Sequence, residues 1–257
     1  MGEAVMKSLK VIKIGGKVID DEQKLNSFLK DFASIKGPKI LVHGGGSNAT
    51  KIGERLGIEA KMIDGRRITD ADTLEVITMV YGGLINKKIV SKLQSLGINA
   101  VGLTGADLNI IPARKRNPEP IDFGWVGDVE TVHTAWLSQF LDSGVVPVLA
   151  PLTHDQQGQM LNTNADTIAS SVVAALSNDF ETELLYCFEQ PGVMNNGKLI
   201  TVMNLLLYRY LKDGGIITDG MIPKLDLGFS ALKKGVKVSI RSFEDVAKLE
   251  SGTKLVK

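Results

Sequence analysis

The fold is decided by the stretch ILVHGGGSNAT, which spans residues 40–50. The β-branched run at 40–42 predicts a buried strand, the glycines at 44–46 a turn, and residues 48–56 a helix. Without Cβ atoms, glycines let backbone N–H groups approach an anion, and a helix N-terminus adds about half a positive charge. The turn therefore suits an oxyanion. A tight strand-to-helix turn that binds nothing explains the triplet equally well, so the rest of the chain has to decide.

The composition is that of an ordinary soluble globular protein. The 257 residues are 44% hydrophobic and 23% charged, which is enough for one large α/β domain or two lobes. The 30 Lys and Arg residues against 29 Asp and Glu leave a formal charge of +1, so no global field attracts nucleic acid or an anionic membrane. The single cysteine, Cys187, excludes an internal disulfide and fits a reducing compartment. We expect a cytoplasmic protein that binds neither nucleic acid nor a membrane.

A second glycine turn follows the first predicted strand. Residues 9–14, LKVIKI, form a β-branched run that ends at a Gly-Gly pair. Helical spacing over 21–35 then leads into the strand at 39–42, which makes a βαβ unit with parallel strands. Lys13 would project at the carboxyl end of its strand, where open α/β sheets bind ligands. The alternative is a lysine that extends into solvent from an edge strand.

The alternation of strands and helices continues to the C-terminus without a low-complexity linker. Strands are predicted at 100–103, 145–150, 183–188 and 236–240, helices at 71–85, 86–96, 167–176, 205–211 and 243–249, and turn-rich excursions at 114–120 and 195–198. Thr69 and Asp70 are both candidate caps for the helix that starts at 71. The pattern predicts an α/β fold with a parallel sheet.

Familiar phosphate-binding motifs fail on spacing. The dinucleotide pattern fails at the triple glycine, because Ala49 stands where the third glycine belongs. Residues 192–198 approach a Walker A sequence, but Leu199 replaces the hydroxyl residue that binds magnesium, so we interpret the segment as a hairpin. The three histidines lack metal-ligand spacing, and we expect His43 to orient the glycine turn rather than to act as a base.

What remains is a distributed set of charged residues and glycines. Lys13 and Lys224 would supply two positive charges, and the glycine turns would supply fixed N–H donors. Asp166 could hold the lysines in place. Phosphoryl transfer uses groups of this kind, because its catalysis is mostly positioning and neutralisation of charge. Arg67 could form a bidentate pair with a substrate carboxylate, or it could be a surface arginine.

Five segments together resemble the amino acid kinase family. They occur in the family's order, at matching separations, and they are VIKIGG at 11–16, VHGGG at 42–46, DGRRIT at 64–69, LNTNAD at 161–166 and IITDGMIPK at 216–224. They cover nearly the whole chain. Arg67 and the segment from Asn162 to Asp166 favour the members that act on N-acetyl-L-glutamate over those that act on aspartate, carbamate, uridylate or glutamate.

The resemblance implies a three-layer αβα sandwich around a mainly parallel central sheet, with two lobes. Residues 1–178 would bind the acyl-glutamate and form the dimer, and residues 179–257 would bind ATP. Arginine-inhibited members carry an extra N-terminal helix, and little sequence precedes Lys10 here. An arginine-insensitive homodimer is therefore expected.

The same resemblance implies roles for individual residues. The transferring phosphoryl group would be stabilised by Lys13 and Lys224, which Asp166 would orient, and would accept N–H bonds from Gly16 and Gly45. The carboxylates of the acceptor would be bound by Arg67, Asn162, Gly44, Gly45 and Gly46. The nucleotide would contact Gly15, Gly16, Ile217, Thr218, Met221 and Lys224. Mg2+ would be held mainly by ATP oxygens, without a metal site of the protein's own.

The leading hypothesis is ATP-dependent phosphorylation of the γ-carboxylate of N-acetyl-L-glutamate, or of a related N-acyl-L-glutamate, to an acyl phosphate in arginine biosynthesis. Residues 104–116, near the expected acyl group, are unusual in composition, which leaves N-succinyl-L-glutamate open as the substrate. Residues 186–192 replace the aspartate-containing turn of such kinases, so the adenosine contacts stay open. The alternative of another class is a non-catalytic nucleotide or amino-acid sensor, and the presence of both lysines weighs against it.

Overall fold

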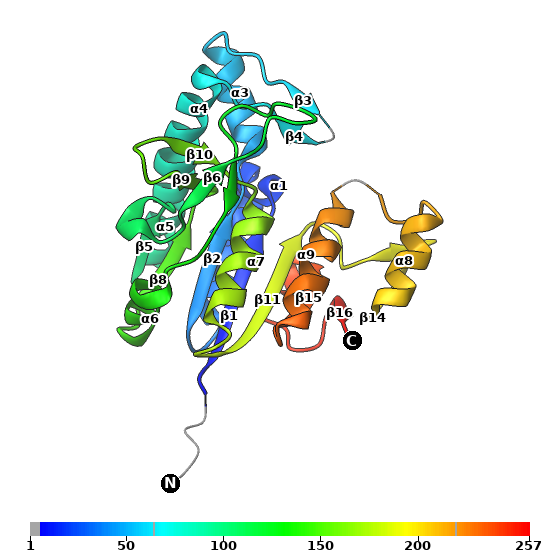
Figure 1. Ribbon diagram of the computed structural model, residues 1–257. Helices are drawn as coiled ribbons and strands as arrows, with labels where there is room; N and C mark the ends of the chain where they lie inside the picture. Colours follow the sequence, from blue (N-terminus) through cyan, green and yellow to red (C-terminus); the bar gives the residue numbers. More distant parts are fainter. Residues whose placement is uncertain (1–5, 64, 219) are drawn as a thin grey trace.

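The computed structural model describes residues 6–63, 65–218 and 220–257. Its centre is an eight-stranded sheet with helices on both faces (Figure 1). In spatial order the strands are β14 (Val202–Met203), β16 (Thr253–Leu255), β15 (Lys237–Ser242), β11 (Glu181–Phe188), β1 (Ser8–Ile14), β2 (Lys39–His43), β8 (Val146–Leu149) and β5 (Ala100–Leu103). From β15 to β5 all neighbours are parallel, whereas β16 is antiparallel to β15. The predicted mainly parallel α/β fold is confirmed.

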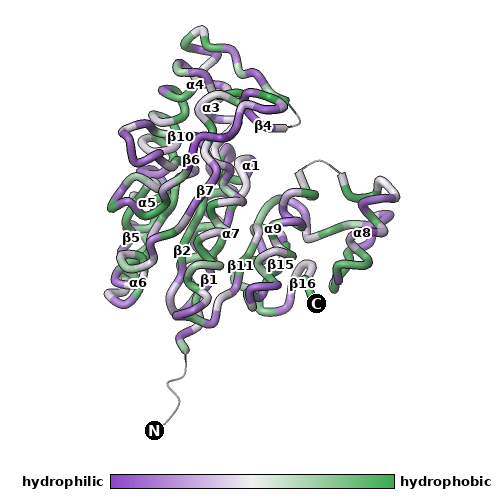
Figure 2. The backbone as a smooth tube through the Cα atoms, in the orientation of Figure 1, coloured by the Kyte–Doolittle hydropathy of each residue, from purple (hydrophilic) through white to green (hydrophobic). Residues whose placement is uncertain are grey.

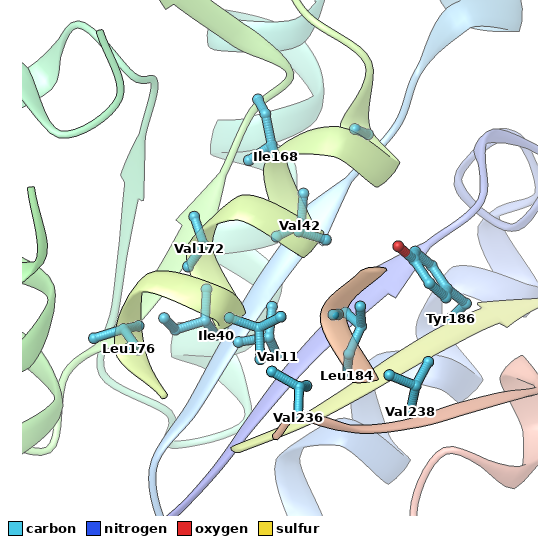
Figure 3. Close-up of a cluster of buried hydrophobic side chains, with 14 of the residues drawn as sticks. Val11, Ile40, Val42, Ile168, Val172, Leu176, Leu184, Tyr186, Val236 and Val238 are labelled. Atoms are coloured by element: carbon cyan, nitrogen blue, oxygen red, sulfur yellow. The ribbon is translucent and has the colours of Figure 1, made fainter. Parts of the chain in front are cut away.

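One face of the sheet forms a first hydrophobic core. Val11 of β1 and Ile40 and Val42 of β2 point to this face, where Ile168 and Val172 cover them (Figure 3). The helices that contribute to this core are α6 (Thr134–Asp142), α7 (Ala165–Leu176), α8 (Leu205–Asp213) and α9 (Met221–Lys233). Because side chains alternate along a strand, the residues between these belong to the opposite face.

The opposite face forms a second core. Ile12 of β1 and Leu41 of β2 pack there with Phe28 and Phe32, all of them fully buried. The helices that contribute are α1 (Gly16–Asp20), α2 (Glu22–Ser34), α3 (Gly46–Arg55), α4 (Ala71–Ile77), the π-helix η1 (Thr78–Ile85), α5 (Asn86–Ser95) and the 3-10 turn η3 (Phe243–Asp245). Complete burial of one such aliphatic or aromatic side chain contributes about 1.5–3 kcal/mol. Two cores on two faces give the expected three layers.

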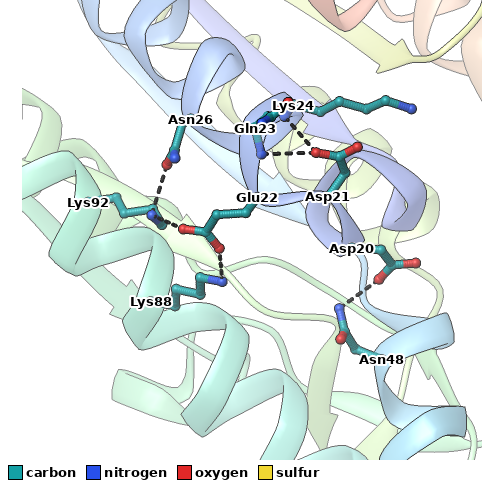
Figure 4. Close-up of polar contacts among 9 residues, drawn as sticks. All are labelled: Asp20, Asp21, Glu22, Gln23, Lys24, Asn26, Asn48, Lys88 and Lys92. Atoms are coloured by element: carbon teal, nitrogen blue, oxygen red, sulfur yellow. Dashed lines mark hydrogen bonds and ion pairs between the residues drawn. The ribbon is translucent and has the colours of Figure 1, made fainter.

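Polar contacts hold the helices of the second layer together at their ends (Figure 4). Glu22, the first residue of α2, pairs with Lys88 and Lys92 of α5. Asn48 of α3 donates to Asp20 of α1 over 2.6 Å from Nδ2 to Oδ1. The second contact matters for the site, because α1 and α3 each begin at one of the two glycine turns.

Short antiparallel hairpins form separate two-stranded sheets outside the eight-stranded one. They are β3 (Met62–Ile63) with β4 (Arg66–Arg67), β6 (Ala113–Lys115) with β7 (Gly127–Val129), β9 (Leu152–His154) with β10 (Met160–Asn162), and β12 (Met194–Asn195) with β13 (Lys198–Leu199), and a 3-10 turn η2 (Asp107–Asn109) precedes β6. The predicted excursions at 114–120 and 195–198 are thus confirmed as hairpin segments. The chain is hydrophilic around β4 and β6 and hydrophobic along the inner strands (Figure 2). In the ranges described above, no helix combines the length and apolar character that a membrane span requires.

Several local expectations are wrong. The helix predicted at 48–56 starts earlier, at Gly46, and the helix predicted at 71–85 is π-helical from Thr78 onward. The predicted helix at 243–249 is only the three-residue η3. Helix α9 and strands β14 and β16 were not expected. Of the two candidate caps Asp70 is the one used, since its carboxylate accepts from the Thr73 N–H over 2.9 Å.

Candidate functional site

Lys13, Asp166 and Lys224 meet at the carboxyl edge of the sheet. The Asp166 carboxylate lies between the two ammonium groups, with Oδ1 2.8 Å from Lys13 Nζ and Oδ2 3.1 Å from Lys224 Nζ. Lys13 and Asp166 are buried, and 17% of the Lys224 side chain is exposed. Three residues far apart in sequence, which the sequence predicted to act together, are therefore in direct contact.

Burial and charge act against each other in this cluster. Burial would raise the pKa of the Asp166 carboxyl, but the charges of Lys13 and Lys224 outweigh it, and the pKa is lowered. Burial lowers the pKa of Lys224; the attraction of Asp166 opposes this shift and the repulsion of Lys13 adds to it. Two cationic side chains around one carboxylate form a site with a positive balance, which suits a polyanion.

The elements explain why these side chains meet. Strand β1 lies between β11 and β2, so Lys13 is not an edge-strand lysine and the snorkelling alternative is wrong. The Asn164 side chain caps α7, with Oδ1 2.8 Å from the Asp166 amide, and so fixes Asp166 in the first turn. Lys224 lies in the first turn of α9, and its Nζ also donates to the carbonyl of Gly220 over 2.9 Å.

The two glycine turns face each other across the ends of β1 and β2. A Cβ built on Gly44 would lie 3.4 Å from the Gly16 amide nitrogen, and one on Gly16 would lie 3.8 Å from the Gly45 amide nitrogen. Gly15 and Gly45 are the N-caps of α1 and α3, and neither has a side chain to satisfy the first N–H groups. The Gly15 N–H itself already donates to the Cys187 carbonyl over 3.0 Å. The later amides of both turns are therefore the candidate donors to a shared anion.

Gly45 cannot be replaced without moving its neighbours. Its φ is +159°, and an added Cβ would lie 2.4 Å from Ile85 Cδ1 and 3.0 Å from Tyr81 Cδ1. Such distances are shorter than van der Waals contact, so only glycine fits between the turn and η1.

His43 orients the triple-glycine turn through a hydrogen bond to the carbonyl of Gly44. It is fully buried, with Nδ1 2.8 Å from the Gly44 carbonyl oxygen and Nε2 3.1 Å from Asn86 Nδ2. A carbonyl can only accept and an amide NH2 can only donate, so Nδ1 carries the proton and Nε2 accepts. Burial lowers the pKa of His43 to about 4, which keeps the ring neutral. These contacts agree with the expected orienting role.

Arg67 and Asn162 belong to a hydrogen-bond network that reaches the triple-glycine turn. Arg67 Nη2 donates to the Gly46 carbonyl over 2.9 Å and to Thr50 Oγ1 over 2.7 Å. Asn162 Nδ2 donates to Thr69 Oγ1 over 3.0 Å, and the Thr69 hydroxyl in turn lies 3.3 Å from the Arg67 carbonyl oxygen. Arg67 is thus anchored against the glycine turn and is not a free surface arginine.

Three other residues predicted to contact the nucleotide share one segment with Lys224, whereas Gly15 and Gly16 belong to the first glycine turn. Ile217 is buried in the first core, Thr218 is exposed, and Met221 begins α9 and packs partly against the same core. Their contact with a nucleotide stays a prediction. Asp64 and Asp219, which belong to two of the quoted motifs, lie outside the described residues.

Two residues of the site were missed by the sequence analysis. Tyr81 contacts the glycine turn, and Asn86 holds His43 and also donates to the Val148 carbonyl over 2.9 Å. Both lie in or beside η1. The signal available was a tyrosine and an asparagine in the mostly apolar segment 78–86, but nothing in their spacing distinguishes them from core residues.

A cavity of about 720 Å³ lies beside the site, and most of its lining comes from the segment 114–128. Its walls include Arg66 from β4 and Pro223 from α9, which are the sequence neighbours of Arg67 and Lys224. In Figure 1, β4 lies near the top of the view and α9 lies below it, beside β11 and β15. In the part of the chain that the structure describes, no group of three His, Cys, Asp or Glu side chains is arranged as a metal site.

The amino acid kinase family model matches residues 8–242, which include every site residue described above. The chain belongs to the amino acid kinase family. The resemblance noted in the sequence is confirmed. Among the relatives, acetylglutamate kinase of Cytophaga hutchinsonii is 54% identical over 262 residues and covers 98% of this chain and 99% of its own. Acetylglutamate kinase of Bacteroides fragilis is 51% identical over 262 residues and covers both chains completely.

Solved structures of the amino acid kinase fold superimpose closely. The crystal structure of smu.665 from Streptococcus mutans has a TM-score of 0.83 at 28% identity, over 96% of this chain and 98% of its own. N-acetylglutamate synthase from Neisseria gonorrhoeae, solved with coenzyme A and N-acetyl-glutamate, has a TM-score of 0.84 at 21% identity, over 98% of this chain and 59% of its own. The second likeness shows the shared fold alone.

Proposed function

We propose that this amino acid kinase transfers the γ-phosphoryl group of ATP to the γ-carboxylate of N-acetyl-L-glutamate, in arginine biosynthesis. The observation that carries the proposal is the contact of Lys13 and Lys224 with one buried carboxylate, Asp166, opposite two glycine turns. Relatives that match over the full chain are named acetylglutamate kinases. Neither the succinyl-glutamate substrate nor the sensor finds support among them.

The reaction needs positioning and charge neutralisation more than covalent chemistry. A γ-carboxylate oxygen forms a bond to the γ-phosphorus, and the bond from that phosphorus to the β–γ bridging oxygen breaks, with its electron pair leaving on ADP. The acceptor carboxylate is already ionised near neutral pH, so no general base is required. Lys13 and Lys224 would neutralise charge on the group in transit, and Asp166 would keep both ammonium groups in place.

The glycine turns would act as fixed donors. The backbone amides of Gly16 and Gly45, whose turns lie close together, would cost no reorganisation during the reaction, because the turns are already formed. Arg67 and Asn162 would bind the α-carboxylate end of the acceptor, with Gly45 and Gly46 close to its γ-carboxylate. On the other side, Ile217, Thr218 and Met221 would lie against the nucleotide.

The donor set fits ATP with its magnesium. The cluster offers ammonium and amide groups, and its one carboxylate is occupied by two lysines, so it suits phosphate oxygens. Mg2+ bound by those oxygens would supply further charge neutralisation. We also infer that residues 1–178 hold the acceptor, that residues 179–257 hold ATP, and that the enzyme works as a homodimer in the cytoplasm.

The proposal is tested with purified protein, ATP and Mg2+ in the presence of hydroxylamine. N-acetyl-L-glutamate should give one ADP and one hydroxamate per turnover, whereas L-glutamate should give little of either. N-succinyl-L-glutamate, run beside it, decides the acyl group through kcat/KM. Absence of both ADP and hydroxamate with every acceptor, together with measurable ATP binding, would favour the sensor instead.

A further inference from the structure

A buried tyrosine lies directly against the triple-glycine turn. Tyr81 belongs to the π-helix η1, and only 5% of it is exposed. A Cβ on Gly45 would lie 3.0 Å from Cδ1 and 3.1 Å from Cε1 of its ring. At the next residue, a Cβ on Gly46 would lie 3.9 Å from its hydroxyl oxygen. The ring therefore supports Gly45, and the hydroxyl reaches Gly46.

Arg67 arrives at the same point from another element. The Gly46 Cβ position is 3.9 Å from Arg67 Nη2 as well as 3.9 Å from Tyr81 Oη, and Nη2 donates to the Gly46 carbonyl over 2.9 Å. The guanidinium and the phenol thus converge on one glycine. Burial raises the pKa of Tyr81, although the nearby Arg67 opposes that shift, so the hydroxyl stays neutral and its oxygen is the acceptor for the guanidinium, which can only donate.

The π-helical form of η1 places the side chains that meet the turn. Tyr81 and Ile85, which are four residues apart in η1, both lie close to the position of a Gly45 Cβ. This helical stretch therefore makes two contacts with one glycine. Short π-helical insertions cost helix stability and are concentrated at functional sites. The π-helical stretch thus brings both Tyr81 and Ile85 against Gly45.

We propose that Tyr81 is a positioning residue of the acceptor site. Its ring holds the Gly45-Gly46 turn, and its hydroxyl orients the Arg67 guanidinium toward the acceptor carboxylate. The inference rests on the proposed function, in which Arg67 binds that carboxylate. Tyr81 lies against the triple-glycine turn on the acceptor side, so its effect should be confined to the acceptor.

Tyr81→Phe removes the hydroxyl and keeps the ring. The KM for N-acetyl-L-glutamate should rise about tenfold, the scale of one hydrogen bond near a charged group, while kcat and the KM for ATP stay within about threefold. Tyr210→Phe, at a tyrosine that is 73% exposed on α8, is the matched control and should leave all constants unchanged. Unchanged acceptor KM in Tyr81→Phe, or a change confined to ATP, would overturn the inference.

A double-mutant cycle separates positioning from simple support. If Tyr81 acts through Arg67, Tyr81→Phe should add little to the acceptor KM of Arg67→Lys; fully multiplicative effects would contradict the coupling. Fluorotyrosine labelling of the wild-type chain provides a measurement that does not depend on the folding of a variant. One of the four tyrosine fluorine resonances should shift with N-acetyl-L-glutamate and not with ATP, and no shift would contradict the role. A wild-type enzyme without acceptor turnover would instead refute the proposed function, and this inference with it.

Discussion

At the level of single residues, the site depends on two positive charges, Lys13 and Lys224, around one negative charge, Asp166. Asp166 is buried and pairs with two lysines, so removing it leaves the buried Lys13 ammonium without its carboxylate partner. Breaking a buried ion pair typically costs about 3–5 kcal/mol. The resemblance named all three residues, because each lies in a recognisable motif. Tyr81 was not predicted, because its role depends on a contact with Gly45 that sequence spacing does not encode.

Replacement of Lys13 tests the charge-neutralising role. Lys13→Ala should lower kcat by about 10²–10³, the effect of removing one transition-state donor, with a smaller change in the KM for the acceptor. Lys17→Ala is the matched control: Lys17 lies four residues further on, in α1, with 83% of its side chain exposed, and its loss should leave kcat unchanged. Steady-state assays with thermal denaturation of each variant make the comparison. A Lys13→Ala enzyme that keeps wild-type kcat would assign the lysine to folding alone.

At the level of elements, prediction succeeded where periodicity was strong. The β1-α2-β2 unit and the strand at Ala100–Leu103 were expected within one or two residues, since β-branched runs and an amphipathic helix identify them. Helix α9 was missed because its first turn contains Pro223 and its middle contains Gly228, which weaken the helical pattern. The π-helix was missed because its hydrogen-bond pattern differs from the α-helical one without a matching change in composition.

His43 of β2, which is buried and bonded to Asn86 of α5, predicts that the free energy of unfolding depends on pH. The pKa of His43 is about 4 in the folded chain against 6.5 in an exposed histidine, so the unfolded chain binds more protons between these values. The free energy of unfolding should therefore fall by up to about 3 kcal/mol as the pH drops from 6.5 to 4. Urea unfolding across this range measures it. His43→Gln should be less stable at pH 7 but should have a flatter curve, and parallel curves for the two proteins would contradict the assignment.

At the level of the whole molecule, one continuous sheet brings together groups from both ends of the chain. Strands β1 and β2 carry the glycine turns, whereas Lys224 comes from α9, which packs on the same face as α7. The layered class was predictable from alternating elements, but the strand order was not, because hydrophobic patterns do not specify which strands pair. The cavity between β4 and α9 likewise arises only from the assembled fold.

The central claim is that a carboxylate oxygen attacks the γ-phosphorus of ATP in this site. N-acetyl-L-glutamate labelled with 18O in its γ-carboxylate tests it directly, by mass spectrometry of the phosphate released after hydroxylamine trapping. Hydroxylamine attacks the carbonyl carbon, so the former carboxylate oxygen should leave with phosphorus, and each phosphate should carry one 18O. Unlabelled phosphate would mean that ATP is cleaved by water, and would contradict the account.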